Sequence, residues 1–487
     1  MNSTHQMNWC ILQSSLFLGA CLSQALGAEL LVPSQFATIQ GAVDAAADGD
    51  IITISPGTYI ENIKLKGSNL TFRSIEPDNL EIRNSTQLHL PTSDSLFDFT
   101  QFPVSWEFRF EGLFLRGSSP NYGGSIKGIP EIQIAVNNCT FYSCGASFEG
   151  GAIFNTKGII RNSTFELCRV ITGVSSAGST YGGAISEFDG LIENCDFIDN
   201  FSDGVCRNNQ GNQTCSFGNG GAIAFSSGTI RNCRFSRNRS TDTGGAIEGF
   251  NGLIEDCFFE LNNARNFGGA ISGIGEHSLI NRCVFVRNSA VGTGAISNCE
   301  GNISNSLFVS NSATVSAGVS SNVFGAYTNC VFYGNSAGSF GSTLGGSYGP
   351  IVNCIFWNNR SRDGTLFGNV FLSDIRNCLI QGWEPDDRGN INAPPSFIDP
   401  TLDSNNRPRD FRLRPDSPAI DRGLRVFDSG SSVSQALQFD ADGNPRPVVN
   451  YPTDIFNRGD GFGTDIGAYE HQTVYDALPS TEVWVVR

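Results

Sequence analysis

The chain has 487 residues, a formal net charge of −16 and only four lysines (Lys64, Lys66, Lys127 and Lys157). Such an acidic chain is poorly suited to bind nucleic acid or anionic lipid, because both partners recruit clustered positive charge. The length allows one long solenoid with terminal modules.

Residues 1–27 predict a secretory signal peptide. Residues 11–22, ILQSSLFLGACL, form an apolar stretch too short to span a bilayer, and the small residues Ala25-Leu26-Gly27 follow as a cleavage site. The alternative is a lipoprotein anchored at Cys21, because LGAC, Leu18 to Cys21, is similar to a lipoprotein box. No other segment is apolar enough to span a bilayer, so no transmembrane segment is expected. The sequence predicts an extracellular or cell-surface protein.

Residues 28–119 predict an N-terminal cap followed by the first coils. Between Phe36 and Asp50, the residues Ile39, Val43 and Ala46 share one helical face. A short helix with this face is suited to cover the open end of a solenoid core. The following sequence, IITISPGTYIENI, predicts a strand, a Pro-Gly turn and a second strand.

Residues 120–383 predict a repeat core. An Asn-Cys-x-Phe pattern recurs roughly every two dozen residues, a Gly-Gly-Ala-Ile pattern keeps step with it, and Phe-x-x-Asn closes many units. The second position of the first pattern falls at Cys139, Ser163, Cys195, Cys233, Cys257, Cys283, Ser306, Cys330, Cys354 and Cys378. Such self-similarity is typical of a solenoid. Within a unit, fixed apolar positions alternate with variable ones, which predicts strands in place of helices.

The Gly-Gly-Ala-Ile and Phe-x-x-Asn markers resemble the repeats of polymorphic outer-membrane proteins, a family of surface adhesins. A coil of about two dozen residues with stacked Asn resembles the right-handed parallel β-helix of the pectate-lyase-like superfamily. The resemblance covers roughly residues 120–380. It implies an all-β, right-handed parallel β-helix with a bacterial surface or extracellular location. It implies little about activity, since one fold hosts many functions.

The recurring Cys and the Asn before it are interpreted as structural. The cysteines lack the paired spacing of zinc ligands and alternate with Ser163 and Ser306, so they predict an inward-facing row of small side chains. Cys144 and Cys168 predict a shorter stack of the same kind. The preceding Asn suits a left-handed turn and a hydrogen bond to the next coil. At the position before it, Arg161, Glu193, Arg231 and Glu255 predict a ladder of alternating charge.

Two insertions lengthen adjacent units at the same corner, before Gly182 and before Gly220. Insertions on one face of a repeat protein often line its binding site; the alternative is tolerated surface variation. The candidate ligand-binding residues combine the amides and rings of these insertions with acids beside Gly-Gly-Ala-Ile. They are Tyr181, Glu187, Asp189, Asn208, Asn209, Gln210, Asn212, Phe217 and Glu248. The three acids could pair as acid and base, or form a solvated acidic face.

Cys206 and Cys215 lie off the repeating position within one insertion, and an oxidising compartment predicts a disulfide between them. Residues 384–472 predict a C-terminal end module, similar to that of secreted bacterial β-helix proteins that precedes varied anchors, and residues 473–487 a tail. Asp440, Asp442 and Asn444 suggest calcium, but Tyr451 stands where an EF-hand needs Glu, so a tight turn is the alternative. No metal site and no cofactor are therefore predicted.

The sequence as a whole predicts a monomeric, non-catalytic protein for adhesion or glycan binding. Its expected partner is an extracellular glycan or another cell-surface component. The alternative is a polysaccharide lyase or glycoside hydrolase. No Gly-x-Ser-x-Gly elbow is expected from Gly345 to Gly349, because this string lies within a repeat.

Overall fold

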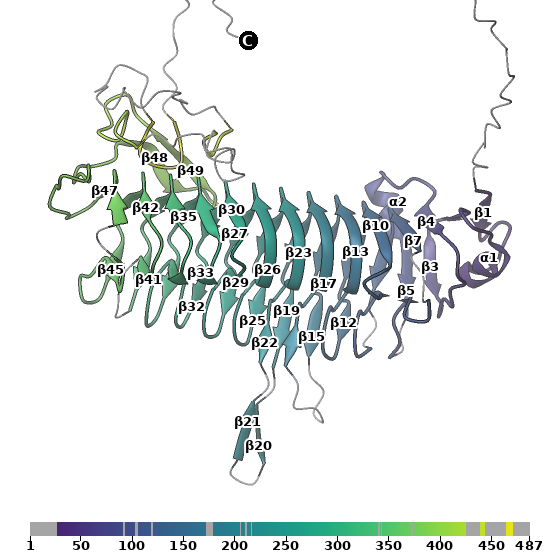
Figure 1. The fold of residues 1–487 in the computed structure, drawn as a ribbon. Coiled ribbons are helices and arrows are strands. Elements are labelled where there is room, and N and C mark those ends of the chain that lie inside the picture. The colour runs from purple at the N-terminus through teal and green to yellow at the C-terminus, as the bar shows by residue number, and fades with distance from the viewer. Residues whose placement is uncertain are drawn as a thin grey trace, which may run out of the picture.

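The computed structural model describes most of the chain. For residues 206–209 and 212–215 it describes the backbone alone. The described residues are 27–90, 93–102, 106–117, 120–171, 179–204, 206–209, 212–215, 217–338, 341, 343–371, 374–424, 439–443 and 464–470. They form a parallel β-solenoid of about 13 turns with very little helix, as predicted (Figure 1).

The N-terminal end of the solenoid is covered by the helix α1 (Ile39–Ala45). Ile39, Ala42 and Val43 are buried, and the Thr38 side chain accepts a hydrogen bond from the Gly41 N–H as an N-cap. The predicted capping helix is therefore confirmed, although it ends at Ala45 and leaves Ala46 as its C-cap. A second short helix, α2 (Leu80–Ser85), was not predicted; Asn79 caps its N-terminus.

Each coil of the repeat core passes through three sheets in turn. The first and largest sheet has 21 strands within the described residues. They are β1 (Glu29–Val32), β2 (Ile51–Ile54), β4 (Leu70–Ser74), β6 (Phe97–Asp98), β7 (Glu107–Glu111), β9 (Ile126–Lys127), β10 (Gln133–Asn137), β13 (Ile153–Arg161), β17 (Ile185–Glu193), β23 (Ile223–Arg231), β26 (Ile247–Glu255), β29 (Ile271–Ile274), β30 (Leu279–Asn281), β33 (Ile296–Cys299), β34 (Asn302–Ser304), β37 (Ser320–Val323), β38 (Tyr327–Thr328), β41 (Leu344–Ser347), β42 (Ile351–Val352), β45 (Phe367–Gly368) and β46 (Ile375–Arg376).

The second and third sheets are built from short strands. The second comprises β3 (Gly57–Ile60), β5 (Thr86–His89), β8 (Phe114–Arg116), β11 (Thr140–Tyr142), β14 (Thr164–Glu166), β18 (Asp196–Ile198), β24 (Arg234–Ser236), β27 (Phe258–Glu260), β31 (Val284–Val286), β35 (Leu307–Val309), β39 (Val331–Tyr333), β43 (Ile355–Trp357) and β47 (Leu379–Ile380). The third comprises β12 (Gly145–Ala146), β15 (Arg169–Ile171), β19 (Phe201–Asp203), β25 (Arg239–Ser240), β28 (Asn263–Ala264), β32 (Ser289–Ala290), β36 (Ser312–Ala313), β40 (Ser336–Ala337) and β44 (Arg360–Ser361). Strands of successive coils pair in parallel in all three sheets, as β17 does with β23, β18 with β24 and β19 with β25.

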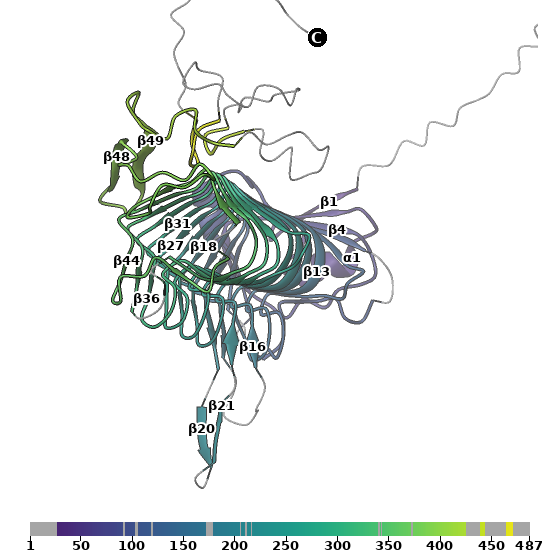
Figure 2. The same cartoon turned by 60° about the vertical axis from the view of Figure 1, so that its left-hand side comes forward.

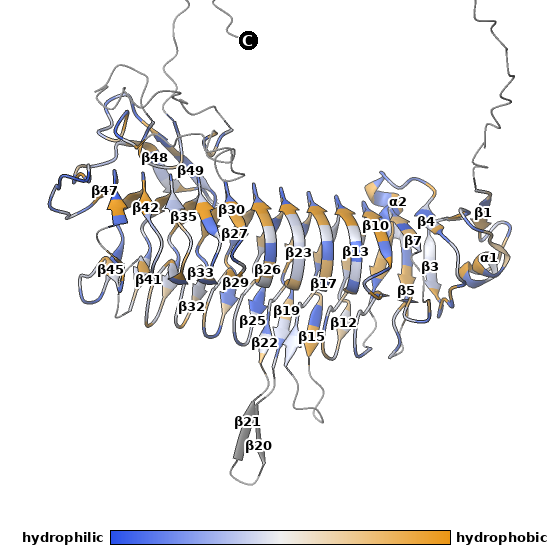
Figure 3. Ribbon diagram, viewed as in Figure 1, coloured by the Kyte–Doolittle hydropathy of each residue, from blue (hydrophilic) through white to orange (hydrophobic). Residues whose placement is uncertain are grey.

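The core is a set of rows in which each coil contributes the same type of side chain. The Phe row of the second sheet stacks ring on ring from Phe141 to Phe356; for example, the centroids of Phe235 and Phe259 lie 4.7 Å apart with an interplanar angle of 5°. The eight cysteines at the repeating position are buried and free, as are Cys144 and Cys168, so the predicted inward rows are confirmed. Figure 3 shows that the strands of the coils carry both apolar and polar residues, as a wall with one buried face requires.

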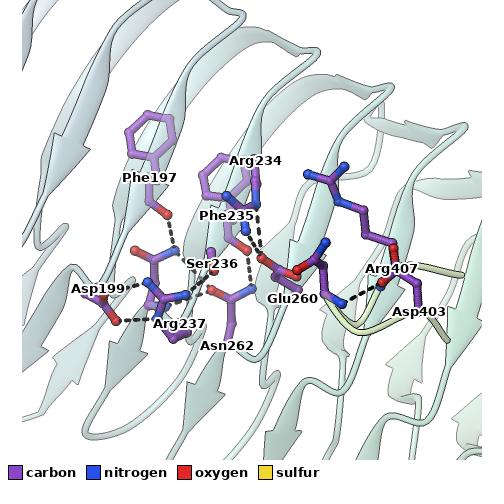
Figure 4. Close-up of polar contacts among 12 residues, drawn as sticks. Phe197, Asp199, Arg234, Phe235, Ser236, Arg237, Glu260, Asn262, Asp403 and Arg407 are labelled. Carbon is purple, nitrogen blue, oxygen red and sulfur yellow. Dashed lines mark hydrogen bonds and ion pairs between the residues drawn. The ribbon is translucent and has the colours of Figure 1, made fainter.

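A buried asparagine ladder runs beside the Phe row, at the last position of Phe-x-x-Asn (Figure 4). The Asn262 Nδ2 donates to the Phe235 carbonyl at 2.9 Å and to the Asn288 Oδ1 at 3.0 Å. The same pattern of bonds to the next coil repeats at Asn200, Asn238, Asn262, Asn288, Asn311 and Asn335. The sequence identified this Asn only as a repeat marker. Its contacts show that it satisfies a turn carbonyl and joins successive coils.

The Asn before the repeating Cys adopts the predicted left-handed backbone, with φ between 48° and 55° at the eight Asn positions. The predicted bond to the equivalent residue is present from Asn194 to Asn162 and from Asn353 to Asn329, at 3.2 and 3.0 Å. The predicted charge ladder is present from Arg161 to Arg231, because the Glu193 carboxylate pairs with both, at 2.9 and 2.5 Å. Glu255 instead pairs with Arg282 at 3.0 Å.

The C-terminal module contributes the antiparallel pair β48 (Phe397–Leu402) and β49 (Pro408–Leu413). Its buried residues Phe397, Phe411 and Ile466 join a cluster with outward-facing residues of the second sheet, such as Val331 and Ile355. The module therefore packs on the side of the last coils (Figure 1). No helix among the described residues is long and apolar enough to cross a membrane.

Candidate functional site

The two insertions lie side by side where they leave the solenoid. The short strands β16 (Thr180–Tyr181) and β22 (Gly218–Asn219) precede the first-sheet strands of adjacent coils and pair in parallel. The Thr180 and Ser202 hydroxyls lie 3.0 Å apart in a buried contact. The predicted adjacency of the insertions is thus confirmed at their bases.

The second insertion forms a hairpin of β20 (Cys206–Asn209) and β21 (Asn212–Cys215), which projects from the solenoid in both views (Figures 1 and 2). Its base is held by one hydroxyl: the Thr241 Oγ1 of the next coil accepts hydrogen bonds from the N–H groups of Gly204 and Gly218, at 2.7 and 3.2 Å. Both ends of the hairpin are therefore tied to the adjacent coil.

The register of the hairpin places Cys206 directly opposite Cys215. Directly opposed antiparallel residues have a Cα separation of about 4.5–5.5 Å, within the range of a disulfide. The predicted disulfide thus stays a prediction that this register favours. The candidate residues Asn208, Asn209 and Asn212 lie in the same two strands, and Gln210 lies outside the described residues.

The residue two positions after Gly-Gly-Ala-Ile adopts a left-handed backbone on nine successive coils. The nine positions are Asn155, Glu187, Phe225, Gly249, Gly273, Asn298, Asn322, Gly346 and Asn369. Asn and Gly adopt this conformation most readily. Glu187 and Phe225 depart from that choice, on the two adjacent coils that follow the insertions.

The fold does not require these two departures. A different left-handed row holds Leu167, Arg237 and Leu261, so the coils also accept other side chains in this backbone, at a cost of about 1–2 kcal/mol. In the row of Glu187, however, the other seven coils use only Asn or Gly, so the carboxylate of Glu187 and the ring of Phe225 are the two exceptions within that row.

Phe225 and Glu187 belong to an acid–aromatic cluster, defined here as Glu149, Tyr181, Ser186, Glu187 and Phe225. Phe225 is 47% exposed, and its ring centroid lies 4.7 Å from that of Tyr181, at an interplanar angle of 56°. The Ser186 hydroxyl donates to the Glu149 Oε2 at 3.0 Å. The cluster therefore presents exposed aromatic surface and two carboxylates beside the bases of the insertions.

The two carboxylates of the cluster differ in environment. Burial raises the pKa of Glu149, and the nearby charge of Glu187 raises it further, against the opposing hydrogen bond from Ser186. Glu187 itself is exposed. Glu149 therefore holds its proton to a higher pH than an exposed glutamate does.

The three candidate acids lie on two strands, β17 and β26. Glu187 and Asp189 lie on one strand and both are exposed, but Glu248 lies two coils further on, with the coil of Phe225 between. Asp189 accepts a hydrogen bond from the Ser227 hydroxyl at 2.7 Å, and burial raises the pKa of Glu248 separately. The acid–base pairing considered for these three acids stays a hypothesis; in the structure, the acid whose charge acts on Glu149 is Glu187.

Sequence reasoning missed Glu149, Ser186 and Phe225. Phe225 could have been found, because aligning the repeats on Gly-Gly-Ala-Ile gives Asn, Glu, Phe, Gly, Gly and Asn at its position. Glu149 could not, because its contact with Ser186 on the next coil depends on how the coils stack. Phe217, at the end of the hairpin insertion, is exposed as expected for a surface contact.

Other candidate motifs remain structural or untested. Ser347, the central residue of Gly345 to Gly349, is buried within β41 of a regular coil, which excludes an exposed elbow. Asp440 is buried and accepts hydrogen bonds from the N–H groups of Asp442 and Glu470, both at 3.0 Å. Within the described ranges, no three His, Cys, Asp or Glu side chains are grouped to hold a metal. The calcium hypothesis stays untested, because Asn444 and Tyr451 lie outside those ranges.

Comparison with known proteins gives fold similarity alone. No protein-family model and no curated protein matches the sequence. Among solved structures, the chain is similar to an alginate lyase of family PL6 (14% identity, TM-score 0.41, 79% of this chain and 55% of the lyase). It is also similar to a pectate lyase (13% identity, TM-score 0.30, 89% of this chain and 91% of the pectate lyase). A third similar structure is a rhamnogalacturonan lyase (14% identity, TM-score 0.35, 80% of this chain and 97% of that lyase). The chain thus spans about half the length of the alginate lyase. At these identities and TM-scores, the similarities carry no information on family or activity.

Proposed function

We propose that this protein is an extracellular glycan-binding protein that holds its ligand on the acid–aromatic cluster, between the two insertions. One observation carries the proposal. The two coils that bear insertions are the same two that replace Asn or Gly with Glu187 and Phe225 in the left-handed row. Binding of a ligand at the acid–aromatic cluster would account for both Glu187 and Phe225 at positions where other coils have Asn or Gly.

The chemistry of the cluster suits a sugar. Exposed rings such as Phe225 offer flat apolar faces, and carboxylates such as Glu187 accept hydrogen bonds from hydroxyl groups. The site lies on the rigid wall of the solenoid, where Tyr181 pairs with Asn219 of the next coil. A rigid site lowers the ordering cost of binding. Adhesion to a glycan-coated surface is the cellular role that we infer from such a site.

The test replaces Glu187 and Phe225 with Asn, a residue that other coils carry at the same left-handed position. The variants Glu187→Asn and Phe225→Asn keep a residue that tolerates the left-handed backbone, so the solenoid should stay folded. A glycan array identifies a ligand of the parent, and isothermal titration then compares the variants. The double variant should bind at least tenfold more weakly, about 1.4 kcal/mol. Asn322→Ala, in the same row four coils further along from Phe225, is the matched control and should bind as the parent does.

A second variant removes the hairpin. Residues 205–216 are replaced by a short turn, which leaves Ser202, Gly204 and Gly218 in place. A longer replacement over 202–218 is unsuitable, because Ser202 is buried and bonded to Thr180. Weaker glycan binding by this folded variant would support a role of the hairpin. Unchanged binding in both this variant and the Asn double variant would reject the proposed site.

The alternative function, cleavage of a polysaccharide, is favoured by one observation: Glu149 has a raised pKa beside the exposed Glu187. A carboxyl group with a raised pKa beside a second carboxyl group is the arrangement with which glycoside hydrolases donate a proton and stabilise or attack the sugar. Incubation with a polysaccharide panel should then release reducing or unsaturated ends, and Glu149→Gln should abolish release while keeping binding. Binding without any product from the parent would reject catalysis and leave the binding proposal standing.

A further inference from the structure

The third sheet carries a hollow on the other flank of the hairpin. It has a volume of about 570 Å³, and its lining includes Phe201, Arg237, Arg239, Thr241 and Arg265. Such a volume is typical of a small-molecule site. Thr241 connects the hollow to the hairpin, because the same hydroxyl accepts hydrogen bonds from both ends of the hairpin base.

The arginines of this hollow differ in what they contact. Arg237 is occupied by an ion pair, since its Nε and Nη2 donate to the two carboxylate oxygens of Asp199 at 2.9 and 2.8 Å. Arg239 and Arg265 are exposed, and neither forms an ion pair with any residue that the structure describes. They leave two guanidinium groups available on an otherwise acidic protein.

The stacking of the coils sets where these groups lie. Arg239 shares an outward row of the third sheet with Phe201, one coil before it, and with Asn263, one coil after it. Arg265 lies two residues beyond Asn263, and so on the same face of the next coil. Coils stack about 4.8 Å apart, so an anion can lie between the two guanidinium groups.

The net charge of the hollow favours an anion. The three arginines outnumber the one lining carboxylate, that of Asp199. The charges of Glu166 and Glu260 also act on Arg237, and Asp242 follows Thr241, where it accepts a hydrogen bond from Asn266. The two arginines without an ion pair among the described residues, Arg239 and Arg265, are therefore the groups open to an anion. Arginine binds the planar oxygens of carboxylate and sulfate in a forked geometry. Phe201 and the partly exposed Leu167 add apolar walls. Charged donors beside apolar walls suit a sugar that bears an acidic group.

We propose that the hollow is a binding subsite for the carboxylate or sulfate group of an acidic sugar, held by Arg239 and Arg265. This inference rests on the proposed glycan-binding function and names the class of ligand: an anionic polysaccharide that contacts both flanks of the hairpin base. The negative charge of the remainder of the protein opposes a polyanion, so its binding depends on Arg239 and Arg265.

The test compares three ligands of different charge and uses the substitution of another exposed arginine as a control. Titration of the folded protein with a neutral glucan, a polyuronate and a sulfated glycan separates the two sources of negative charge. The double variant Arg239→Gln/Arg265→Gln should lower the affinity for the anionic ligand by about tenfold, and added salt should weaken binding by the parent. Arg360→Gln is the control, because Arg360 is exposed in the same outward row as Arg239, five coils away.

The outcomes distinguish the two proposals. Stronger binding of the polyuronate or the sulfated glycan, lost in the double variant and kept in Arg360→Gln, supports the hollow and identifies the acidic group. Equal affinity for neutral and anionic glycans, unchanged in the double variant, overturns the hollow while the proposed function stands. If the parent binds none of the three ligands nor any glycan on the array, the proposed function fails and the inference fails with it.

Discussion

Removing one side chain of the buried asparagine ladder should destabilise the solenoid by several kcal/mol. Asn262 is fully buried, and its amide makes four hydrogen bonds. The Nδ2 donates to the Phe235 carbonyl and the Asn288 Oδ1, while the Oδ1 accepts from the N–H and the Nδ2 of Asn238, at 2.9 and 3.0 Å. The substitution Asn262→Ala deletes all four.

The magnitude follows from the groups that lose a partner. The backbone N–H of Asn238 loses a buried acceptor, the Asn238 Nδ2 keeps only its bond to the Phe197 carbonyl, and the Phe235 carbonyl loses one donor. The Asn288 Oδ1 still accepts from the N–H of residue 262. A buried polar group left without a partner costs about 1–3 kcal/mol, so the total is roughly 3–5 kcal/mol.

The assay is equilibrium urea unfolding followed by circular dichroism, with the slope of the transition compared between variants. Asn263→Ala is the control, since the neighbouring side chain is only partly buried and donates to Ser289 alone. It should cost less than about 1 kcal/mol. Hydrogen exchange should show the loss of protection concentrated in the coils on either side of Asn262, because coils contact only their neighbours. A loss of less than about 1 kcal/mol for Asn262→Ala would refute the role assigned to the ladder.

Two further predictions concern the hairpin and the acid–aromatic cluster. Mass spectrometry of a non-reduced digest should find Cys206 linked to Cys215 while the buried cysteines stay free; free thiols at both positions would contradict the register argument. Because the pKa of Glu149 is raised above 4.5 in the folded protein, the native state binds more protons than the unfolded state between that value and the raised pKa. Stability attributable to this group should therefore fall as the pH rises through that window. Glu149→Gln should be more stable than the parent at neutral pH, with the difference vanishing below about pH 4.5, and a constant difference across the titration would argue against the raised pKa.

The sequence by itself determined the fold class, because each coil repeats the same apolar, Cys and Phe positions and each position has one structural role. The burial of the cysteines, the left-handed Asn before them and the charge ladder at Glu193 all follow from one coil lying on the next in register. The repeat spacing also located the insertions, and these could be placed on adjacent coils without a structure.

The tertiary structure decided which polar side chains meet. Glu149 reaches Ser186 across a coil boundary, and Glu187 is separated from Glu248 by the coil of Phe225; both facts depend on side-chain direction and coil stacking, which repeat spacing does not encode. The same holds for Arg239 and Arg265, which look like isolated surface charges in the sequence. Only the stacking of the third sheet brings them to one hollow, because residues 26 positions apart lie on neighbouring coils about 4.8 Å apart.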